Sequence, residues 1–310
     1  IGVFYVESPD MRQLQKKTNK GDFGHLVIHS SIIRPAANVF INEYIRRLKG
    51  GTYDSLHPLL DEKLKETYGI MVYQEDVSKV VMALADFSPA EADDLRKVIS
   101  KKHKQKKVLD YRNQFYSGAV KNGISKETCS KIWDMIMSFS GYSFCKPHSA
   151  SYALVSFKSA YLRAHYPAEF IAAVISNMGG YYSAFAYISE ARRMGLNILM
   201  LDINQSQIQY TGCNKNVRVG LMQIKGITRN AIKKTIAERE KHGLFKSFDD
   251  FVTRVKIDAT DTIKLVKAGC FDSIESFASR PSLIWRLQWH QSEKQSNKQN
   301  VTLGLFEATT

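Results

Sequence analysis

Residues 149–176 read SASYALVSFKSAYLRAHYPAEFIAAVIS, a long and mostly apolar stretch with helical character. Pro167 interrupts it. Proline lacks the amide proton that a position inside a helix needs, and its ring clashes with the preceding turn. We therefore predict a helical segment that is broken or kinked at Pro167 and that contributes core material.

The neighbouring sequence extends the helical pattern. Apolar residues recur at helical spacing over residues 41–48 and 77–84, and the run from Ser88 to Glu91 has the form of a capped helix start. We therefore expect a mainly helical region from about residue 70 to residue 200.

A different pattern begins near residue 196. Short β-like runs at Ile198 and Val217 flank a polar turn at residues 214–216, and helical spacing resumes from about 228 to 270. The sequence thus predicts a mainly α fold (α with a small β portion), with a domain boundary near residue 205.

The net positive charge of the chain indicates the kind of partner that it binds. Its 310 residues include 44 Lys and Arg against 30 Asp and Glu, which gives a formal net charge of +14 and a pI near 9.5. Such an excess indicates a polyanionic partner such as nucleic acid. A hydrophobic fraction of 44% argues against a disordered basic tail, and no apolar run approaches the roughly 18 residues of a membrane helix.

Other classes of protein are disfavoured by missing motifs. The four cysteines are far apart and form no CxxC pair, which argues against a zinc site or a disulfide framework and favours a cytoplasmic location. There is no Walker loop, GxGxxG, HExxH or serine-elbow motif, and nothing resembles a complete metal site. The sequence begins IGVFYVESPDM, without an initiator methionine or a leader, so we expect no secretory signal and a piece of a longer protein.

Residues 141–152, GYSFCKPHSASY, form the densest group of candidate binding residues. If Pro147 lies in the first turn of a helix, the free amides and the dipole at that N-terminus, beside Lys146 and His148, outline an anion site. Tyr152 on the same helical face can stack on a base, and Arg163 can contact a phosphate. The arrangement suits a nucleotide; alternatively, Tyr152 packs in the core and His148 is a satisfied polar residue.

A second candidate region is a run of basic residues. Arg96 and Lys97 precede residues 101–107, KKHKQKK, with five lysines in seven positions. Such a block is too repulsive to be buried. It can hold a triphosphate or follow a duplex backbone, and a solvated loop would have the same sequence.

A third candidate is the turn IKGIT at residues 224–228, which apolar residues follow at helical spacing. It has the form of a helix-hairpin-helix, in which the amides of a tight turn at Gly226 meet a phosphate before the second helix. An ordinary helical hairpin would give the same pattern.

Several longer motifs occur in a fixed order. They are GVFYVES at 2–8, RP at 34–35, ETYGIMVYQE at 66–75, GYSFCKPHS at 141–149, YALVS at 152–156 and AHYPAEF at 164–170. In order and spacing they resemble the family C DNA polymerases, the family of the bacterial DNA polymerase III alpha subunits. The resemblance covers about residues 1–275 and implies the end of the palm, most of the fingers and the following helix-hairpin-helix region of a DNA-directed DNA polymerase.

The resemblance also implies roles for individual residues. The fingers of that family bind the incoming dNTP and the nascent base pair; the implied dNTP-binding residues are Arg96, Lys101, Lys102, Lys146, His148 and Tyr152. The implied contacts to primer-template DNA are Lys104, Lys106, Lys107, Lys225 and Gly226. The string TLGLF at 302–306 is similar to the internal sliding-clamp motif, with Leu303, Leu305 and Phe306 as contacts and Thr302 in place of the usual glutamine.

The departures from the family concern catalysis. Palm carboxylates of the family hold two Mg²⁺ ions, and we expect the paired aspartates upstream of residue 1 and a third carboxylate where this chain has His25. An imidazole is a poor ligand for Mg²⁺. The resemblance therefore implies Mg²⁺ in the parent enzyme, with ligands mostly outside this chain, and no catalytic residue within it. Ala36-Ala37, Met200-Leu201 and Thr228 also depart from the family pattern and suggest a divergent, error-prone branch.

The resemblance gives a domain plan and two hypotheses. We expect a junction of palm and fingers at 1–70, the fingers at 71–205, a helix-hairpin-helix-like module at 206–275 and a flexible tail at 276–310. The first hypothesis is the binding part of a polymerase, inactive on its own, with primer-template DNA, dNTP, the sliding clamp and other replisome subunits as partners. The alternative is a non-catalytic DNA-binding or clamp-associated protein that retains the fingers scaffold; a generic RNA-binding protein rests on charge alone.

Overall fold

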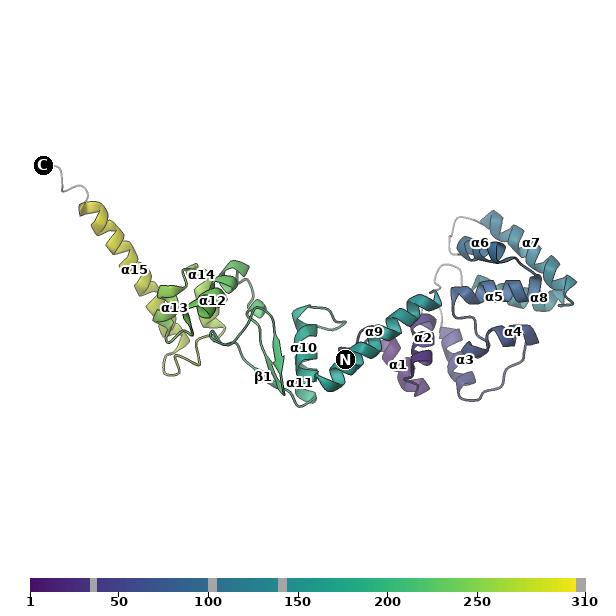
Figure 1. Ribbon diagram of the computed structural model, residues 1–310, viewed down its shortest axis with the longest axis horizontal. Coiled ribbons are helices and arrows are strands. Elements are labelled where there is room, and N and C mark those ends of the chain that lie inside the picture. Colours follow the sequence, from purple (N-terminus) through teal and green to yellow (C-terminus); the bar gives the residue numbers. More distant parts are fainter. Residues whose placement is uncertain (34–37, 100–104, 139–143, 305–310) are drawn as a thin grey trace. The chain divides into compact units, whose positions relative to one another are not determined.

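The computed structural model describes residues 1–33, 38–99, 105–138 and 144–304 (Figure 1). Contacts divide the chain into two compact units, one with residues 1 and 3–161 and the other with residues 2 and 162–310. The division lies within helix α9 (Lys146–His165). It coincides with none of the boundaries expected at 70, 205 and 275.

The described part of the first unit is built from helices. They are α1 (Pro9–Thr18), α2 (Phe23–Ile32), α3 (Asn38–Leu48), α4 (Pro58–Lys63), the 3-10 helix η1 (Lys65–Thr67), α5 (Gln74–Ala85), α6 (Pro89–Ile99), α7 (Gln105–Lys121), α8 (Lys126–Met137) and most of α9. The helices predicted at 41–48 and 77–84 are thereby confirmed as α3 and α5. The capped start is confirmed too, because the Ser88 amide donates to the Glu91 carboxylate (2.8 Å) and the Glu91 amide to the Ser88 hydroxyl (3.3 Å).

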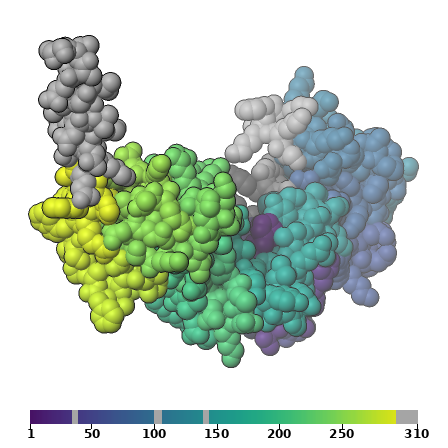
Figure 2. Space-filling view, turned by 60° about the vertical axis from the view of Figure 1, so that its left-hand side comes forward, coloured from purple at the N-terminus to yellow at the C-terminus, as the bar shows by residue number. Residues whose placement is uncertain are grey.

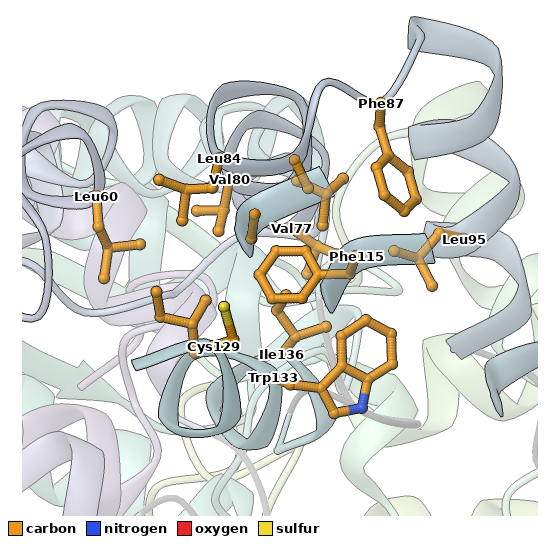
Figure 3. Close-up of a cluster of buried hydrophobic side chains, with 14 of the residues drawn as sticks. Leu60, Val77, Val80, Leu84, Phe87, Leu95, Phe115, Cys129, Trp133 and Ile136 are labelled. Carbon is orange, nitrogen blue, oxygen red and sulfur yellow. The ribbon is translucent and has the colours of Figure 1, made fainter. Parts of the chain in front are cut away.

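The larger core of the first unit lies among α4 to α8 (Figure 3). Phe115 of α7 and Trp133 of α8 are buried in it, with ring centroids 5.6 Å apart. Helix α7 approaches the end of α5 so closely that a Cβ on Gly118 would lie 2.3 Å from the Ala85 carbonyl oxygen. A side chain at position 118 would therefore separate the two helices.

A second core of the same unit joins α1, α2 and α3 to the segment before α5. Tyr44, Val72 and Tyr73 are buried there together with Ala153 of α9. This packing holds the N-terminal half of α9 against the first unit.

The second unit combines helices with a small sheet. Its elements are the end of α9, α10 (Pro167–Ser176), α11 (Ala184–Arg193), β1 (Asn197–Leu199), β2 (Thr211–Cys213), β3 (Asn216–Arg218), η2 (Leu221–Gln223), α12 (Arg229–His242), α13 (Phe248–Arg254), α14 (Ala259–Lys267) and α15 (Arg280–Gly304). The predicted break at Pro167 is confirmed, since α9 ends at His165 and α10 begins at Pro167.

The core prediction for residues 149–176 is right for one of the two helices. Phe170, Ile171 and Ile175 of α10 are buried, whereas Leu154 and Phe157 of α9 are 50% and 40% exposed. The buried residues of α9 are Ser149, Ala153 and Ser156. Helix α9 therefore packs in this chain through small side chains and leaves much of its apolar surface in solvent.

The sheet has the strand order β1-β3-β2, with β1 parallel and β2 antiparallel to β3. The β-like runs predicted at Ile198 and Val217 are confirmed as β1 and β3, which pair at these two residues. Strand β2 had not been predicted. It lies so close to α10 that a Cβ on Gly212 would be 2.2 Å from the Ala168 carbonyl carbon.

Helices α12 to α15 enclose the core that follows the sheet (Figure 1). Figure 2 shows this region as the green and yellow part of the surface. Leu283 and Leu287 of α15 are buried in its core, and Arg286 forms an ion pair with Glu275 at 3.0 Å. The expectation of a flexible tail from residue 276 is therefore wrong for this part of α15. The segment is rich in polar residues, but its two leucines, four residues apart, lie on one face of the helix and are buried. Trp285 and Trp289 on α15 are 74% and 68% exposed.

The prediction of a mainly α fold with a small β portion is confirmed. Within the described ranges, no helix is both long and apolar enough to span a membrane.

Candidate functional site

A row of aromatic rings follows one face of the N-terminal half of α9. The His148 ring is stacked on Phe144 (centroids 5.8 Å apart, planes 7° apart) and meets the Tyr152 ring edge-on at 4.3 Å. The Tyr152 ring in turn stacks on Phe4 at 5.4 Å and meets Tyr5 edge-on at 4.8 Å. His148 is exposed and Tyr152 half-buried. Tyr152 is thus half-buried among aromatic rings and is not a core residue, and its stacking on a base stays a prediction.

The N-terminal segment is fastened to α9 beside this row. The Phe4 amide donates to the Ser159 hydroxyl (3.2 Å), and the Ser156 hydroxyl donates to the Phe4 carbonyl (2.8 Å). The Tyr5 hydroxyl donates to the Ser30 carbonyl (3.2 Å). Burial, and to a smaller extent neighbouring Tyr152, raises the pKa of Tyr5, so the phenol stays neutral at physiological pH. Phe4 and Tyr5 therefore contribute to the row in a defined position.

The N-terminus of α9 has the predicted form, with Pro147 in the first helical turn. Its groups already have partners in this chain. The Lys146 amide donates to the Glu75 carboxylate at 3.0 Å, and the Lys146 ammonium lies 2.5 Å from the Glu66 carboxylate and 5.5 Å from the centre of the Tyr73 ring. An anion at this N-terminus would have to displace Glu66 from Lys146 or bind beside the pair.

Arg96 is linked to the same region through α5. Its guanidinium donates to the Asp93 carboxylate (2.7 Å) and to the side-chain oxygen of Gln74 (2.7 Å). The backbone amide of Gln74 donates to the Phe144 carbonyl at 3.1 Å. Arg96 thus supports the backbone that carries the Phe144 ring, a link that the sequence did not reveal.

The lysine block is described in part. Lys101, Lys102 and Lys104 lie outside the described residues. Lys106 and Lys107 are exposed at the start of α7, and the Lys107 ammonium is 4.0 Å from the Asp94 carboxylate. Exposure fits both the phosphate-binding and the solvated-loop interpretation of the block.

Arg163 does not extend the candidate nucleotide face. Its guanidinium donates to Glu190, a 5% exposed carboxylate that also pairs with Arg193 at 2.6 Å. Hydrogen bonds from Arg193 and Arg163 lower the pKa of Glu190 to about 2. The interpretation of Arg163 as a phosphate contact is therefore replaced by an ion pair with α11.

His25 lies in the first turn of α2 and contacts Asp22, the N-cap of that helix. The His25 Nδ1 and the Asp22 carboxylate are 2.6 Å apart, and Nε2 lies 3.3 Å from the Tyr68 hydroxyl. The Asp22 pKa is lowered, mainly by the hydrogen bond from the His25 amide. His29, one turn farther, is fully buried, and its Nδ1 has no hydrogen-bond partner among the described residues.

These residues do not fit a Mg²⁺ site. The described partners of His25 are one carboxylate, Asp22, and one phenol, Tyr68, whereas Mg²⁺ requires near-octahedral oxygen ligands. Elsewhere in the described ranges, no group of three or more His, Cys, Asp and Glu side chains is placed to hold a metal ion.

The predicted hairpin lies between η2 and α12. Gly226 has φ = +76°, a conformation that favours glycine, and Lys225 beside it is exposed. The Lys264 ammonium donates to the Gly226 carbonyl (2.5 Å), and the Thr228 hydroxyl donates to the Asp261 carboxylate (2.6 Å). Thr228 also caps α12 by accepting from the Ala231 amide (3.1 Å). The threonine that departs from the family pattern thus fastens the hairpin to α14.

The clamp-like string lies at the end of the chain. Leu305 and Phe306 are outside the described residues, and Leu303 belongs to the last turns of α15, where side chains are not described.

Sequence reasoning missed several members of this site. Phe4, Tyr5 and Phe144 all lie within the motifs quoted above, but their contact with Tyr152 depends on packing between segments about 150 residues apart. The acidic partners Glu66 and Glu75 are also within a motif, but their contacts with Lys146 join segments 71 to 80 residues apart, which no local pattern reveals.

Two family models match the chain. Residues 1–123 match the finger domain of the bacterial DNA polymerase III alpha subunit, and residues 195–281 match a helix-hairpin-helix motif.

Individual relatives agree with these matches. The chain is 36% identical over 287 residues to a DNA polymerase III subunit alpha of Saccharopolyspora erythraea, covering 88% of this chain and 24% of the relative. It is 38% identical over 278 residues to the subunit of the same name from Aquifex aeolicus, covering 87% and 24%. It is also 33% identical over 306 residues to an error-prone DNA polymerase of Bdellovibrio bacteriovorus, covering 96% and 29%.

The chain thus spans about a quarter of the length of these relatives. Most of it aligns with them, and the two model matches follow one another along the chain. The chain belongs to the bacterial DNA polymerase III alpha subunit family.

Proposed function

We propose that this chain is the fingers and helix-hairpin-helix portion of a DNA-directed DNA polymerase, and that it binds the incoming dNTP and primer-template DNA during 5′-3′ synthesis. The aromatic row from Phe144 through His148 to Tyr152 is the observation that carries the proposal. A base can stack on an accessible ring, and stacking contributes about 1–3 kcal/mol per base. Family membership supplies the substrate class.

The triphosphate would lie toward the N-terminus of α9. Lys146, Arg96 and the undescribed Lys101 and Lys102 are the cations proposed to face it. Because Lys146 pairs with Glu66 in this chain, we infer that the triphosphate competes with this carboxylate for the ammonium. The base would then meet the row at Tyr152, about one helical turn from His148.

The duplex is proposed to lie against the turn at Lys225 and Gly226, with Lys104, Lys106 and Lys107 as further phosphate contacts. The turn leaves the Lys225 side chain exposed, which supports a contact with backbone phosphates. The sliding clamp and other replisome subunits are proposed partners of the parent protein, and the cytoplasm is its proposed location.

Phosphoryl transfer would depend on residues outside this chain. We propose that Mg²⁺ is held by carboxylates elsewhere in the parent enzyme, where the metal stabilises the charge that develops on the transferred phosphate. The residues of this chain bind and orient the substrates. On its own the chain is expected to be inactive.

Calorimetric titration of the 310-residue chain tests the binding proposal. A primer-template duplex is added first and the matched dNTP second. We expect Tyr152→Ala to weaken dNTP binding about tenfold, whereas Tyr161→Ala, at an exposed tyrosine of the same helix, leaves it unchanged. Equal effects of the two variants, or no binding of dNTP by the wild-type chain, would contradict the proposal.

The second candidate function is a non-catalytic DNA-binding or clamp-associated protein. His25 favours it, because the described residues around it are unsuited to Mg²⁺. The two functions differ in the parent protein: a primer-extension assay of the full-length polypeptide with Mg²⁺ and dNTPs yields product for the first and none for the second.

A further inference from the structure

A groove with a volume of about 390 Å³ lies beside α12, away from the Gly226 turn. It is formed by the second half of α12, the end of α13 and the connection to α14. Its lining residues are Lys234, Ala237, Glu238, Lys241, Arg254, Val255 and Lys256. Lys225 and Gly226 precede the first turn of α12 and do not line it.

The one carboxylate among these lining residues is already compensated. Glu238 accepts from Arg254 at 3.1 Å and pairs with His242 at 2.8 Å. Arg254 is held further by Asp250 at 3.0 Å and by the Gly243 carbonyl at 2.8 Å. The guanidinium is thus fixed in internal contacts.

Three lysines remain to give the groove its charge. Lys234, Lys241 and Lys256 are exposed. The Lys234 ammonium donates to the Lys256 carbonyl at 3.3 Å. This hydrogen bond places Lys234 of α12 next to Lys256 of the α13–α14 connection. Like charges gathered in an open groove repel one another unless an anion lies between them.

The spacing of the lysines fits a polymer of phosphates. Lys234 and Lys241 are seven residues apart, so they lie on one face of α12 and about 10.5 Å apart along its axis. Successive phosphates of one DNA strand are about 3.4 Å apart along the duplex axis, so the two positions span about three of them. We propose that this groove is a second phosphate-backbone site, which binds a stretch of nucleic acid strand beyond the one at the Gly226 turn.

This inference rests on the proposed function for its ligand. An acidic peptide would offer carboxylates to the same lysines. We favour nucleic acid because the groove lies within the residues that match the helix-hairpin-helix model and because the chain as a whole carries a net charge of +14.

The test measures how duplex affinity depends on salt. The wild-type chain, a triple variant (Lys234→Gln, Lys241→Gln, Lys256→Gln) and a control triple variant (Lys16→Gln, Lys17→Gln, Lys20→Gln) are titrated with a fluorescent 20-base-pair duplex from 50 to 200 mM salt. The control lysines are exposed in and after α1, and their removal changes the net charge equally. Thermal unfolding by circular dichroism verifies that both variants fold, and a variant that unfolds is replaced by its three single substitutions.

We expect the groove variant to reduce the slope of log affinity against log salt by about 2 to 3, since each phosphate contact contributes about 0.9. The control should change it by less than about 1. Equal slopes for both variants would overturn the groove site. If Lys225→Gln still lowers the slope, the proposed function stands; if the wild-type chain does not bind the duplex, that function fails as well.

Two further ligands identify the source of the anion. A poly-glutamate peptide that binds the wild type as tightly as the duplex, and loses binding in the groove variant, would overturn the nucleic-acid assignment in favour of an acidic protein. Inorganic phosphate that displaces the duplex at millimolar concentration, beyond an equal ionic strength of chloride, would likewise overturn it in favour of a free-phosphate site.

Discussion

The exposed ring of His148 has two aromatic neighbours. Phe144 covers one face and Tyr152 meets its edge. Truncating either His148 or Tyr152 removes a ring that is proposed to contact the base or sugar of the dNTP, while the residues proposed to contact the duplex lie elsewhere on the chain.

We therefore predict that His148→Ala and Tyr152→Ala, in an active full-length polymerase that carries this segment, raise the KM for dNTP about five- to a hundredfold, the range expected for a stacked base. The Kd for primer-template should change much less. Steady-state primer extension and a DNA-binding titration measure the two quantities. An unchanged KM would remove both residues from the nucleotide site.

Buried His29 of α2 allows a test of how the stability of the chain depends on pH. Burial, and secondarily the neighbouring His25, lowers the pKa of His29 from 6.5 to about 4. Between these two values the unfolded chain binds a proton at His29 more readily than the folded chain does. The contribution of His29 to the free energy of unfolding is therefore fully present above pH 6.5 and is lost as the pH falls toward 4.

We expect His29→Gln to flatten this decline between pH 6.5 and 5, where carboxylates contribute little. Urea unfolding followed by circular dichroism at several pH values measures it. Exposed His165 offers the control substitution, His165→Gln, which should leave the decline intact. An equal decline in wild type and His29→Gln would argue that His29 is protonated in the folded chain.

At the residue scale, the sequence identified the central residues of the candidate site but not the side chains that contact them. Tyr152 and His148 were identified because they lie four residues apart, on one face of the helix predicted to begin near Pro147. The rings around them, Phe4 and Tyr5, come from the opposite end of the first unit in sequence, and helical periodicity carries no information on such contacts. The same reason explains why Arg163 was taken for a phosphate ligand: its partner Glu190 lies 27 residues away on α11.

At the scale of elements, helix boundaries followed from local chemistry. The break at Pro167 and the capped start at Ser88 depend on a few adjacent residues and were predicted correctly. Strand β2 and the buried face of α15 depend instead on what packs against them. In α15 the apolar positions Leu283 and Leu287 lie among polar residues and next to exposed tryptophans, so that composition alone indicated a tail.

The role of α15 can be tested by substitution. Leu287→Ala should destabilise the chain by about 2–4 kcal/mol, because it leaves a cavity in a packed core. Trp285→Ala, on the exposed side of the same helix, should change the stability by less than about 0.5 kcal/mol. Urea unfolding of the two variants decides the matter, and comparable stabilities would mean that α15 does not contribute to the core.

The lysine block before and within the start of α7 gives a second test at this scale. Replacing Lys101, Lys102, Lys104, Lys106 and Lys107 by Gln should flatten the salt dependence of duplex affinity, by about 0.9 for each lost phosphate contact. The measurement is the same titration with the fluorescent duplex from 50 to 200 mM salt. A slope equal to that of wild type would identify the block as solvated surface.

At the scale of the whole molecule, the sequence predicted the family and the fold class but not how the chain divides into units. The motifs mark regions of sequence that the family shares, whereas the division into compact units depends on which surfaces of the chain pack together. The division lies inside helix α9, which contributes to both units. Boundaries placed between motifs could not predict a division within one helix.

The chain as a whole should bind without catalysing. With primer-template, dNTPs and Mg²⁺, we expect no primer extension by residues 1–310, because the carboxylates proposed to hold the metal lie outside them. A full-length parent, assayed in parallel, provides the positive control. Extension by the isolated chain would show that it contains a metal site after all.

The three tryptophans divide unevenly between the units. Trp133 is 4% exposed in the core of the first unit, while Trp285 and Trp289 are largely in water on the second. Indole emission moves to longer wavelength when the ring enters water, so two of the three fluorophores already emit at the red end in the folded chain. A red shift on denaturation therefore reports the opening of the first unit almost alone, and the chain carries a built-in optical probe for the half that holds the aromatic row.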